Sequence, residues 1–294
     1  NDGTAAVVEF FEKNKIQPAF SLDEGSFVID GFLPGVETPI ASINVAEKGF
    51  VNVDIIAHGT GGHSSMPPKE TAVGILAAAL LKLQEAPLPG GLDGVSADMF
   101  DSVGRNLPFF PRLLFANRWL FGGMIESTLE AMPPGNAMLR TTTAPTMLKA
   151  SVKVNVLAIE AVGTINFRLH PRDSIKSLEN YIKKVVDDER VDVIVQAGGK
   201  PASRVSSTES DAFQHISEAA QASFGKLIVA PGITVAGTDS ARYEKIAKNS
   251  YRFNPMNVSS EDTAGFHGTN ERISIDNMAK ATNFYRTLIK LSTE

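Results

Sequence analysis

A histidine lies in a glycine-rich, polar segment near the end of the chain. The segment reads GFHGTNER at residues 265–272, and His267 is one of five histidines among 294 residues. A neutral imidazole is the commonest metal ligand in proteins, and neighbouring glycines let a histidine approach an ion without obstruction. The residue types alone leave three interpretations open: a metal ligand, a general base, or an ordinary surface loop.

Two further segments carry residue types suited to chemistry. FSLDEG places Asp23 where a short apolar run ends, and carboxylates at the ends of strands line many sites in α/β folds. GTGGHSSMPP places His63 in a segment whose glycines and prolines predict a loop without regular structure. Each residue has an ordinary alternative, because most acidic turn residues cap or solvate a turn and most loop histidines lie at the surface.

The elements that must position these residues follow from the spacing of apolar side chains. Helical spacing predicts helices at 4–13, 69–83, 175–185, 209–223 and 276–291. Alternating or β-rich stretches predict strands at 20–25, 50–56, 138–157, 163–170, 191–199 and 226–237. We therefore expect a compact α+β domain at residues 45–200, inserted into an α/β remainder formed by residues 1–44 and 201–294.

Residues 84–135 differ from their surroundings. Prolines and glycines interrupt both ends, and FFPRLLFANRWLFGGM between them contains the only tryptophan, Trp119. We interpret the segment as helical excursions on one domain, with its aromatic side chains packed in a core. The alternative is an apolar wall for a hydrophobic substrate or a subunit contact.

Composition excludes several classes of protein. The chain is 43% hydrophobic and 21% charged with a net charge of −5, and it has no long basic block, so we expect no nucleic-acid partner. The absence of cysteine excludes disulfides and cysteine metal sites but leaves the compartment unknown. The longest apolar stretch, at 71–83, is shorter than the roughly 18 residues of a membrane helix, so we expect no membrane partner.

Nine motifs in a fixed order carry a resemblance to a known family. They are LDEG, AEKG, GTGGHSSMPP, LRTTTAPTM, KVNVL, NFRLHP, GTDSARY, SYRFNP and FHGTNER. The set resembles the dizinc metallopeptidases that include carboxypeptidase S, aminoacylase and the secreted N-fatty-acyl-amino-acid hydrolases, and it is most similar to the carboxypeptidase S branch. The resemblance implies an α/β, partial zinc-peptidase catalytic domain, interrupted by an inserted α+β lid or dimerisation domain.

The resemblance also implies roles for individual residues. Asp23 would bind one metal ion and His267 the other. His63, on the inserted domain, would stabilise the oxyanion, and in dimeric members of the family this histidine reaches the partner's site. Asn155 and Arg168 would help to hold the substrate. These two are separated by enough chain for a strand, a turn and a return strand, so we expect both to face one cleft.

The sequence departs from the family pattern in several places. Ala158 stands where proline usually follows NVL, and Arg242 is displaced by one residue from the position where a basic residue often follows the serine of GTDS. The His-x-Asp pair and the Glu-Glu pair, which supply metal ligands and the general base, do not occur. NDGTAAVVEFF resembles the segment that follows the family's Glu-Glu pair. We therefore expect residues 1–294 by themselves to be inactive and to bind zinc weakly or not at all.

For the complete protein, the resemblance implies an enzyme with two zinc ions. Such an enzyme hydrolyses the amide bond next to a free carboxylate, in a peptide or an N-acyl amino acid, and a homodimer is compatible with it. The alternative from a different class is a non-catalytic dimerisation or binding module without metal. Deacetylation or desuccinylation on the same scaffold is a further alternative. The acyl group, the side-chain preference, the oligomeric state and the compartment stay open.

Overall fold

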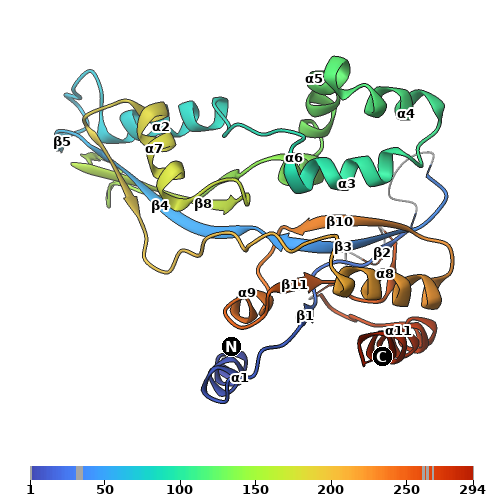
Figure 1. The fold of residues 1–294 in the computed structure, drawn as a ribbon. Helices are drawn as coiled ribbons and strands as arrows, with labels where there is room; N and C mark the ends of the chain where they lie inside the picture. The colour runs from blue at the N-terminus through green and yellow to red at the C-terminus, as the bar shows by residue number, and fades with distance from the viewer. Residues whose placement is uncertain (1, 31–35, 260–261, 263–264, 267, 294) are drawn as a thin grey trace. The chain divides into compact units, whose positions relative to one another are not determined.

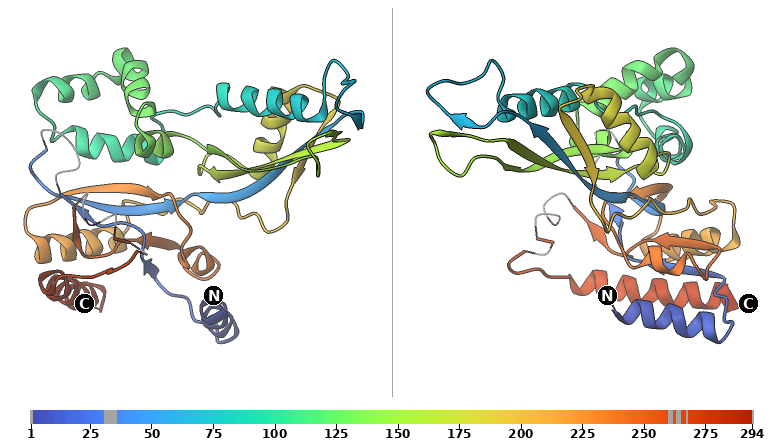
Figure 2. Two further views of the ribbon diagram at one scale, coloured as in Figure 1. Left: turned by 180° about the vertical axis from the view of Figure 1, so that it is seen from behind. Right: turned by 90° about the vertical axis from the view of Figure 1, so that its left-hand side faces the viewer.

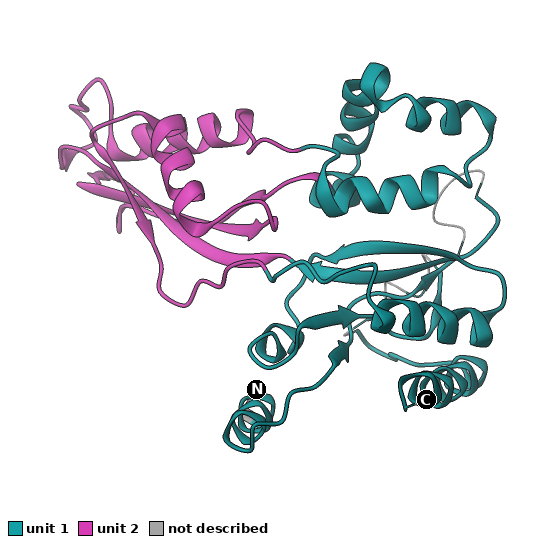
Figure 3. Ribbon diagram, in the orientation of Figure 1, with its two compact units in different colours: residues 1–47, 91–138, 203–294 teal, residues 48–90, 139–202 magenta. Residues whose placement is uncertain are grey.

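The computed structural model describes residues 2–30, 36–259, 262, 265–266 and 268–293. It is a mixed helix-and-sheet structure that divides into two compact units (Figures 1 and 3). Unit 1 comprises residues 1–47, 91–138 and 203–294, and unit 2 comprises residues 48–90 and 139–202. Within the described ranges, no helix is both long and apolar enough to cross a membrane.

Unit 1 is a sheet with helices on both faces. In chain order its elements are α1 (Asp2–Lys13), β1 (Phe20–Asp23), β2 (Val28–Ile29), β3 (Ile40–Glu47), α3 (Gly94–Gly104), α4 (Phe109–Ala116), α5 (Arg118–Glu130), α6 (Pro133–Leu139), α8 (Asp211–Phe224), β10 (Ile228–Thr234), α9 (Ser240–Tyr243), β11 (Asn249–Arg252), β12 (Asn257–Val258) and α11 (Ile275–Thr293). The strands are ordered β1-β11-β3-β2-β12, and β10 pairs with β3. Helices α8 and α11 lie side by side on one face, whereas α3 lies against β10 on the other (Figures 1 and 2).

Strand β3 is the buried centre of this sheet. Its Ile43 and Val45 pack in one core with Ile216 of α8 and Phe284 of α11. All but one of the residues of β3 are buried. A strand that is covered on both faces loses the regular alternation of apolar and polar residues, which explains why the spacing pattern did not predict β3.

An arginine at the end of β11 is completely buried. The Arg252 side chain donates to the Ser250 carbonyl at 2.9 Å and lies 3.3 Å from one carboxylate oxygen each of Glu47 and Glu244. A buried charge is stable only when it is paired and hydrogen-bonded, and here two carboxylates supply the pairing. This network holds the carboxyl end of β11 in place, and the parallel register places Asp23 of β1 directly beside Arg252.

Unit 2 has two layers, a sheet with helices on one face. Its elements are β4 (Gly49–His58), β5 (Gly62–His63), α2 (Ala72–Glu85), β6 (Thr142–Lys149), β7 (Val156–Leu157), β8 (Glu160–Leu169), α7 (Ile175–Val186) and β9 (Val191–Val195). The main sheet is ordered β6-β8-β4-β9, and β5 pairs with β7. Alternate residues of β4 are fully buried under α2 and α7. The opposite face is polar, with hydrogen bonds such as Asn166 to Asn52 at 2.9 Å.

Three expectations about domain bounds, burial and local structure also differ from the structure. The predicted inserted domain at 45–200 covers nearly all of unit 2, but it also includes 91–138, whose helices pack in unit 1. Trp119 is 83% exposed, so the expectation that it packs in a core is wrong. The segment around His63, expected to lack regular structure, contains the short strand β5.

Candidate functional site

Asp23 ends strand β1 with one carboxylate oxygen fixed and the other unpartnered. Its Oδ1 accepts a hydrogen bond from the Glu24 backbone N–H at 2.9 Å. Its Oδ2 is buried and has no hydrogen-bond partner among the described residues. Tyr285 of α11 lies close by, and burial, followed by the negative charge of Asp23, raises the pKa of its phenol. A buried carboxylate oxygen without a donor is costly, so Asp23 fits a role as ligand to a cation.

The other residue expected to bind metal, His267, lies outside the described residues. Within the described part of the chain, no group of three or more His, Asp or Glu side chains could hold a metal ion. Protein zinc sites typically use three or four protein ligands. The described residues therefore offer one suitable ligand, Asp23, and not a complete site.

His63 lies exposed on β5 with a defined tautomer. Its Nδ1 accepts a hydrogen bond from the Ser65 backbone N–H at 3.2 Å, and the Ser65 hydroxyl lies 2.9 Å from the same nitrogen. A backbone N–H can only donate, so Nδ1 carries a lone pair and the proton of the neutral ring lies on Nε2. No described residue bonds to Nε2. The side chain therefore presents an N–H donor, which is the group that oxyanion stabilisation requires.

Asn155 is the neighbour of His63 in this part of unit 2. Strand β5 pairs with β7, with His63 opposite Val156, and the Ser64 backbone N–H donates to the Asn155 carbonyl at 3.1 Å. His63 on β5 and Asn155, in the turn directly before β7, are thus neighbours although they are far apart in sequence. Both residues are exposed.

Arg168 lies at the opposite end of β8 from this pair. The β5–β7 ladder continues beyond the end where His58 pairs with Glu160, whereas Arg168 pairs with Phe50 near the other end. Eight residues of extended chain separate Glu160 from Arg168, or roughly 26 Å. The expectation that Asn155 and Arg168 face one cleft is therefore wrong within one protomer. The reason is that the chain does not turn back after Asn155 but continues through β7 into β8.

The Arg168 guanidinium is half-buried and has open donors. Its centre lies 5.4 Å from the centroid of the Phe50 ring, a cation–π contact on the polar face of the sheet. It makes no hydrogen bond or ion pair with any residue that the structure describes. A planar, permanently charged fork with free donors is well suited to a carboxylate.

A second cation lies buried beside Arg168. Lys48 is 2% exposed, and its Nζ donates to the Arg140 carbonyl at 2.8 Å. Burial, followed by the positive charge of Arg168, lowers the pKa of Lys48 to about 7, and the negative charge of Asp173 opposes this shift. An anion bound at Arg168 would therefore also be near Lys48.

The Lys48 pKa predicts a pH-dependent stability. Between about pH 7 and about pH 10.4 the unfolded chain holds a proton that the folded protein has lost, so folding becomes more favourable as pH rises through this window. Lys48→Met removes the cost of burying the charge. We expect the stability of Lys48→Met relative to the wild type to be greatest below pH 7 and to decrease toward pH 9, in urea unfolding at three pH values. Lys184→Met, at an exposed site on α7, is the control, and a pH-independent difference for Lys48→Met would contradict the assignment.

The comparison with protein families identifies the class to which this fold belongs. Residues 45–193, about half of the chain, match the M20 family model described as the peptidase dimerisation domain. The chain therefore belongs to the M20 peptidase family. The matched range contains every residue of β4, β5, α2, β6, β7, β8 and α7, and hence His63, Asn155 and Arg168.

Individual relatives agree with this membership. The chain is 37% identical to the N-fatty-acyl-amino acid synthase/hydrolase PM20D1 of Mus musculus over 286 residues, which are 96% of this chain and 57% of the relative. It is 37% identical to the probable carboxypeptidase S-like 2 of Dictyostelium discoideum over 292 residues, 99% of this chain and 56% of the relative. The chain thus spans little more than half the length of these relatives.

Solved structures share the fold at low sequence identity. The M20 family metallo-carboxypeptidase Sso-CP2 of Sulfolobus solfataricus superposes with a TM-score of 0.61 at 17% identity, covering 97% of this chain and 66% of that structure. The aminopeptidase PepT of Bacillus cereus gives 0.56 at 14% identity, covering 100% of this chain and 62% of that structure. Membership of this metallopeptidase family implies a divalent metal ion.

Proposed function

We propose that the full-length protein hydrolyses the amide bond next to a free carboxylate, in an N-acyl amino acid or a C-terminal peptide, with two zinc ions. The single observation that carries this proposal is the buried, unpartnered Oδ2 of Asp23, because a bound cation would satisfy such an oxygen. The names of the relatives, an N-fatty-acyl-amino acid synthase/hydrolase and a probable carboxypeptidase S-like protein, support this substrate class. The direct test is hydrolysis of an N-acyl amino acid by the full-length protein before and after metal removal.

Each side chain has one task in this proposal. Asp23, and by family resemblance His267, would hold the metal ions, which when bound polarise the carbonyl and lower the pKa of the attacking water. His63 donates its Nε2 proton in a hydrogen bond to the oxygen that becomes negative in the transition state. Arg168 binds the free carboxylate of the substrate. The expected inactivity of residues 1–294 by themselves stays a prediction.

A homodimer formed by unit 2 is part of the proposal. Strand β6 lies at the edge of its sheet, and its Met147 and Leu148 are 69% and 71% exposed. Helix α2 lies beside it and exposes Val73 and Leu81. An exposed apolar edge strand is a site for pairing with another chain, and the peptidase dimerisation domain spans both elements. His63 would then serve the site of the partner subunit.

Replacing Arg168 tests the carboxylate assignment. We expect Arg168→Lys to raise KM about 10-fold for substrates with a free carboxylate and to change KM less for their carboxamides, because a point charge replaces a bidentate fork. Steady-state kinetics with matched acid and amide substrates measure this difference. Arg190→Lys, whose exposed side chain bonds to Asp188 and Glu70, should change neither. Equal losses for acid and amide would show that Arg168 is structural.

A further inference from the structure

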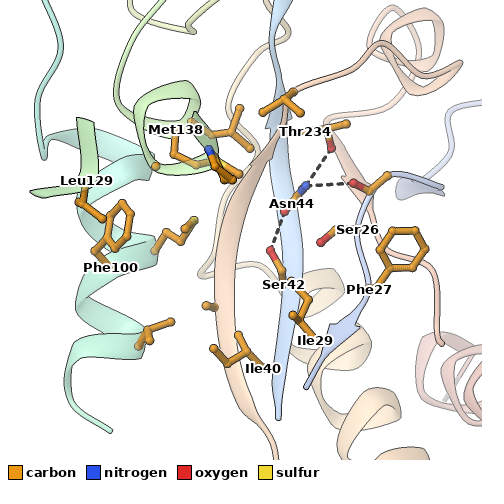
Figure 4. A pocket seen from close by; sticks show the side chains of 18 of the residues that line it. Ser26, Phe27, Ile29, Ile40, Ser42, Asn44, Phe100, Leu129, Met138 and Thr234 are labelled. Atoms are coloured by element: carbon orange, nitrogen blue, oxygen red, sulfur yellow. Dashed lines mark hydrogen bonds between the residues drawn. The ribbon is translucent and has the colours of Figure 1, made fainter. Parts of the chain in front are cut away.

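Unit 1 contains an apolar cavity of about 340 Å³. Its walls are the helical segment 91–138 on one side and strands β2, β3 and β10 on the other (Figure 4). Phe100 of α3, Leu129 of α5 and Met138 of α6 line the helical wall, and Ile40 and Ala230 line the sheet wall. The volume lies at the lower end of the range, about 300–1,000 Å³, that is typical of small-molecule sites.

Few polar groups border this cavity, and the largest of them, the Asn44 amide, is already hydrogen-bonded. Asn44 Nδ2 donates to the Thr234 hydroxyl at 2.9 Å and to the Gly25 carbonyl at 3.3 Å, and Asn44 Oδ1 accepts from the Ser42 hydroxyl at 2.9 Å (Figure 4). The Ser26 hydroxyl also lines the cavity and makes no hydrogen bond with a described residue, so it is one polar group that a ligand could use. A polar ligand would lose its bonds to water and find few replacements here, whereas an apolar ligand loses nothing. The lining of the cavity therefore favours binding of a hydrocarbon chain over binding of a polar group.

Two residues that line the cavity lie close to Asp23, the residue assigned to the metal. Gly25, which lines it, follows Asp23 by two residues, so their Cα atoms are at most about 7 Å apart. Across the sheet, Asp23 pairs with Arg252 and Arg252 pairs with Asn44, another lining residue, which places Asn44 about 10 Å from Asp23. A substrate whose amide lies at Asp23 can therefore extend an apolar tail into the cavity.

We propose that this cavity binds the unbranched acyl chain of an N-acyl amino acid. This inference rests on the proposed function and favours one of its two substrate classes, the N-acyl amino acid. A peptide is a poorer fit to the apolar cavity, because its backbone carries polar groups at every residue. Three lining residues, Met99, Met132 and Met138, have flexible thioether side chains that adapt to chains of different length. Each methylene taken from water strengthens binding by about fourfold, so kcat/KM of the full-length protein should rise with acyl length until the cavity is filled.

The test uses acetyl, octanoyl and palmitoyl derivatives of one amino acid with the full-length protein. Met99→Trp fills the cavity with a rigid ring, and it should lower kcat/KM for the octanoyl and palmitoyl substrates by about 10-fold while changing the acetyl substrate by less than about twofold. Met124→Trp is the matched control, since Met124 is half-exposed on α5 and does not line the cavity. Met138→Trp, from α6, repeats the test if Met99→Trp does not fold.

The outcomes separate this inference from the proposed function. A wild-type enzyme that cleaves all three substrates without preference for length, or a Met99→Trp enzyme that loses all three equally, overturns the acyl-chain site and leaves the proposed function intact. Hydrolysis of neither an N-acyl amino acid nor the C-terminal bond of a peptide overturns the proposed function. In that case, calorimetric titration of the metal-depleted full-length protein with dodecanoate tests whether the cavity binds an acyl chain, independently of catalysis. Binding that Met99→Trp abolishes and Met124→Trp retains supports it, and no binding overturns it.

Discussion

Replacing His63 by alanine is expected to lower kcat of the full-length protein by about 100-fold or more while leaving its metal content unchanged. The Ser65 backbone N–H holds Nδ1 as an acceptor, so the Nε2 proton is available to the developing oxyanion. A donor that acts in the transition state contributes to kcat and not to metal affinity. Steady-state kinetics together with metal analysis by plasma emission measure both quantities on one preparation.

His58 provides a matched control for this replacement. It is also an exposed histidine of unit 2, at the end of β4, and its Nε2 lies 2.8 Å from Asp192. His58→Ala should keep kcat within about twofold of the wild type, because the loss of an exposed side-chain contact has little effect. Loss of bound metal in His63→Ala, in contrast, would make His63 a ligand and contradict the oxyanion role.

Replacing Asp23 by asparagine is expected to have the larger effect, on metal content and on activity together. The amide keeps the shape of the carboxylate but removes the negative charge from the buried Oδ2 position. Loss of a residue that only supports a metal ligand costs about 10–100-fold in metal affinity or activity, so loss of a ligand itself should exceed 100-fold. Metal analysis after dialysis and kcat at saturating substrate are the measurements.

The control for Asp23 is Asp30→Asn, an exposed carboxylate directly after β2 in the same unit. It should keep both metal and activity. If Asp23→Asn retained its full metal content, the unpartnered oxygen would need another explanation, and the metal assignment would be wrong.

Mixing Asp23→Asn subunits with His63→Ala subunits tests whether the protein forms a dimer with shared sites. Recovered activity is expected if His63 serves the partner subunit, and no recovery would place both residues in one subunit's site.

The elements with strong periodicity could be predicted from the sequence. Strands β4 and β8 alternate between buried and partly exposed residues along their length, and α2, α7, α8 and α11 all lie close to the ranges that apolar spacing predicts. Strand β3 could not, because burial on both faces removes the alternation. The packing of 91–138 in unit 1 was also missed, since these helices reach their partners across a long gap in sequence.

The candidate site also has a part that the sequence could predict and a part that it could not. The motifs pointed to Asp23 and His63, and the structure adds what no local pattern contains: the unpartnered Oδ2 and the fixed tautomer. The proximity of Asn155 to His63 depends on pairing between β5 and β7, and such long-range pairing is not visible in local spacing. Arg252 was not singled out either, because the carboxylates that make its burial tolerable come from Glu47 and Glu244, on other segments of unit 1.

Hydrolysis of an N-acyl amino acid by the full-length protein, before and after metal removal, is the most direct test of a metal-dependent amide hydrolase. A chelator should abolish turnover, zinc should restore it, and the matched N-acyl amino acid amide should be cleaved more slowly at every stage. Undiminished turnover by protein shown to be free of metal would contradict the account.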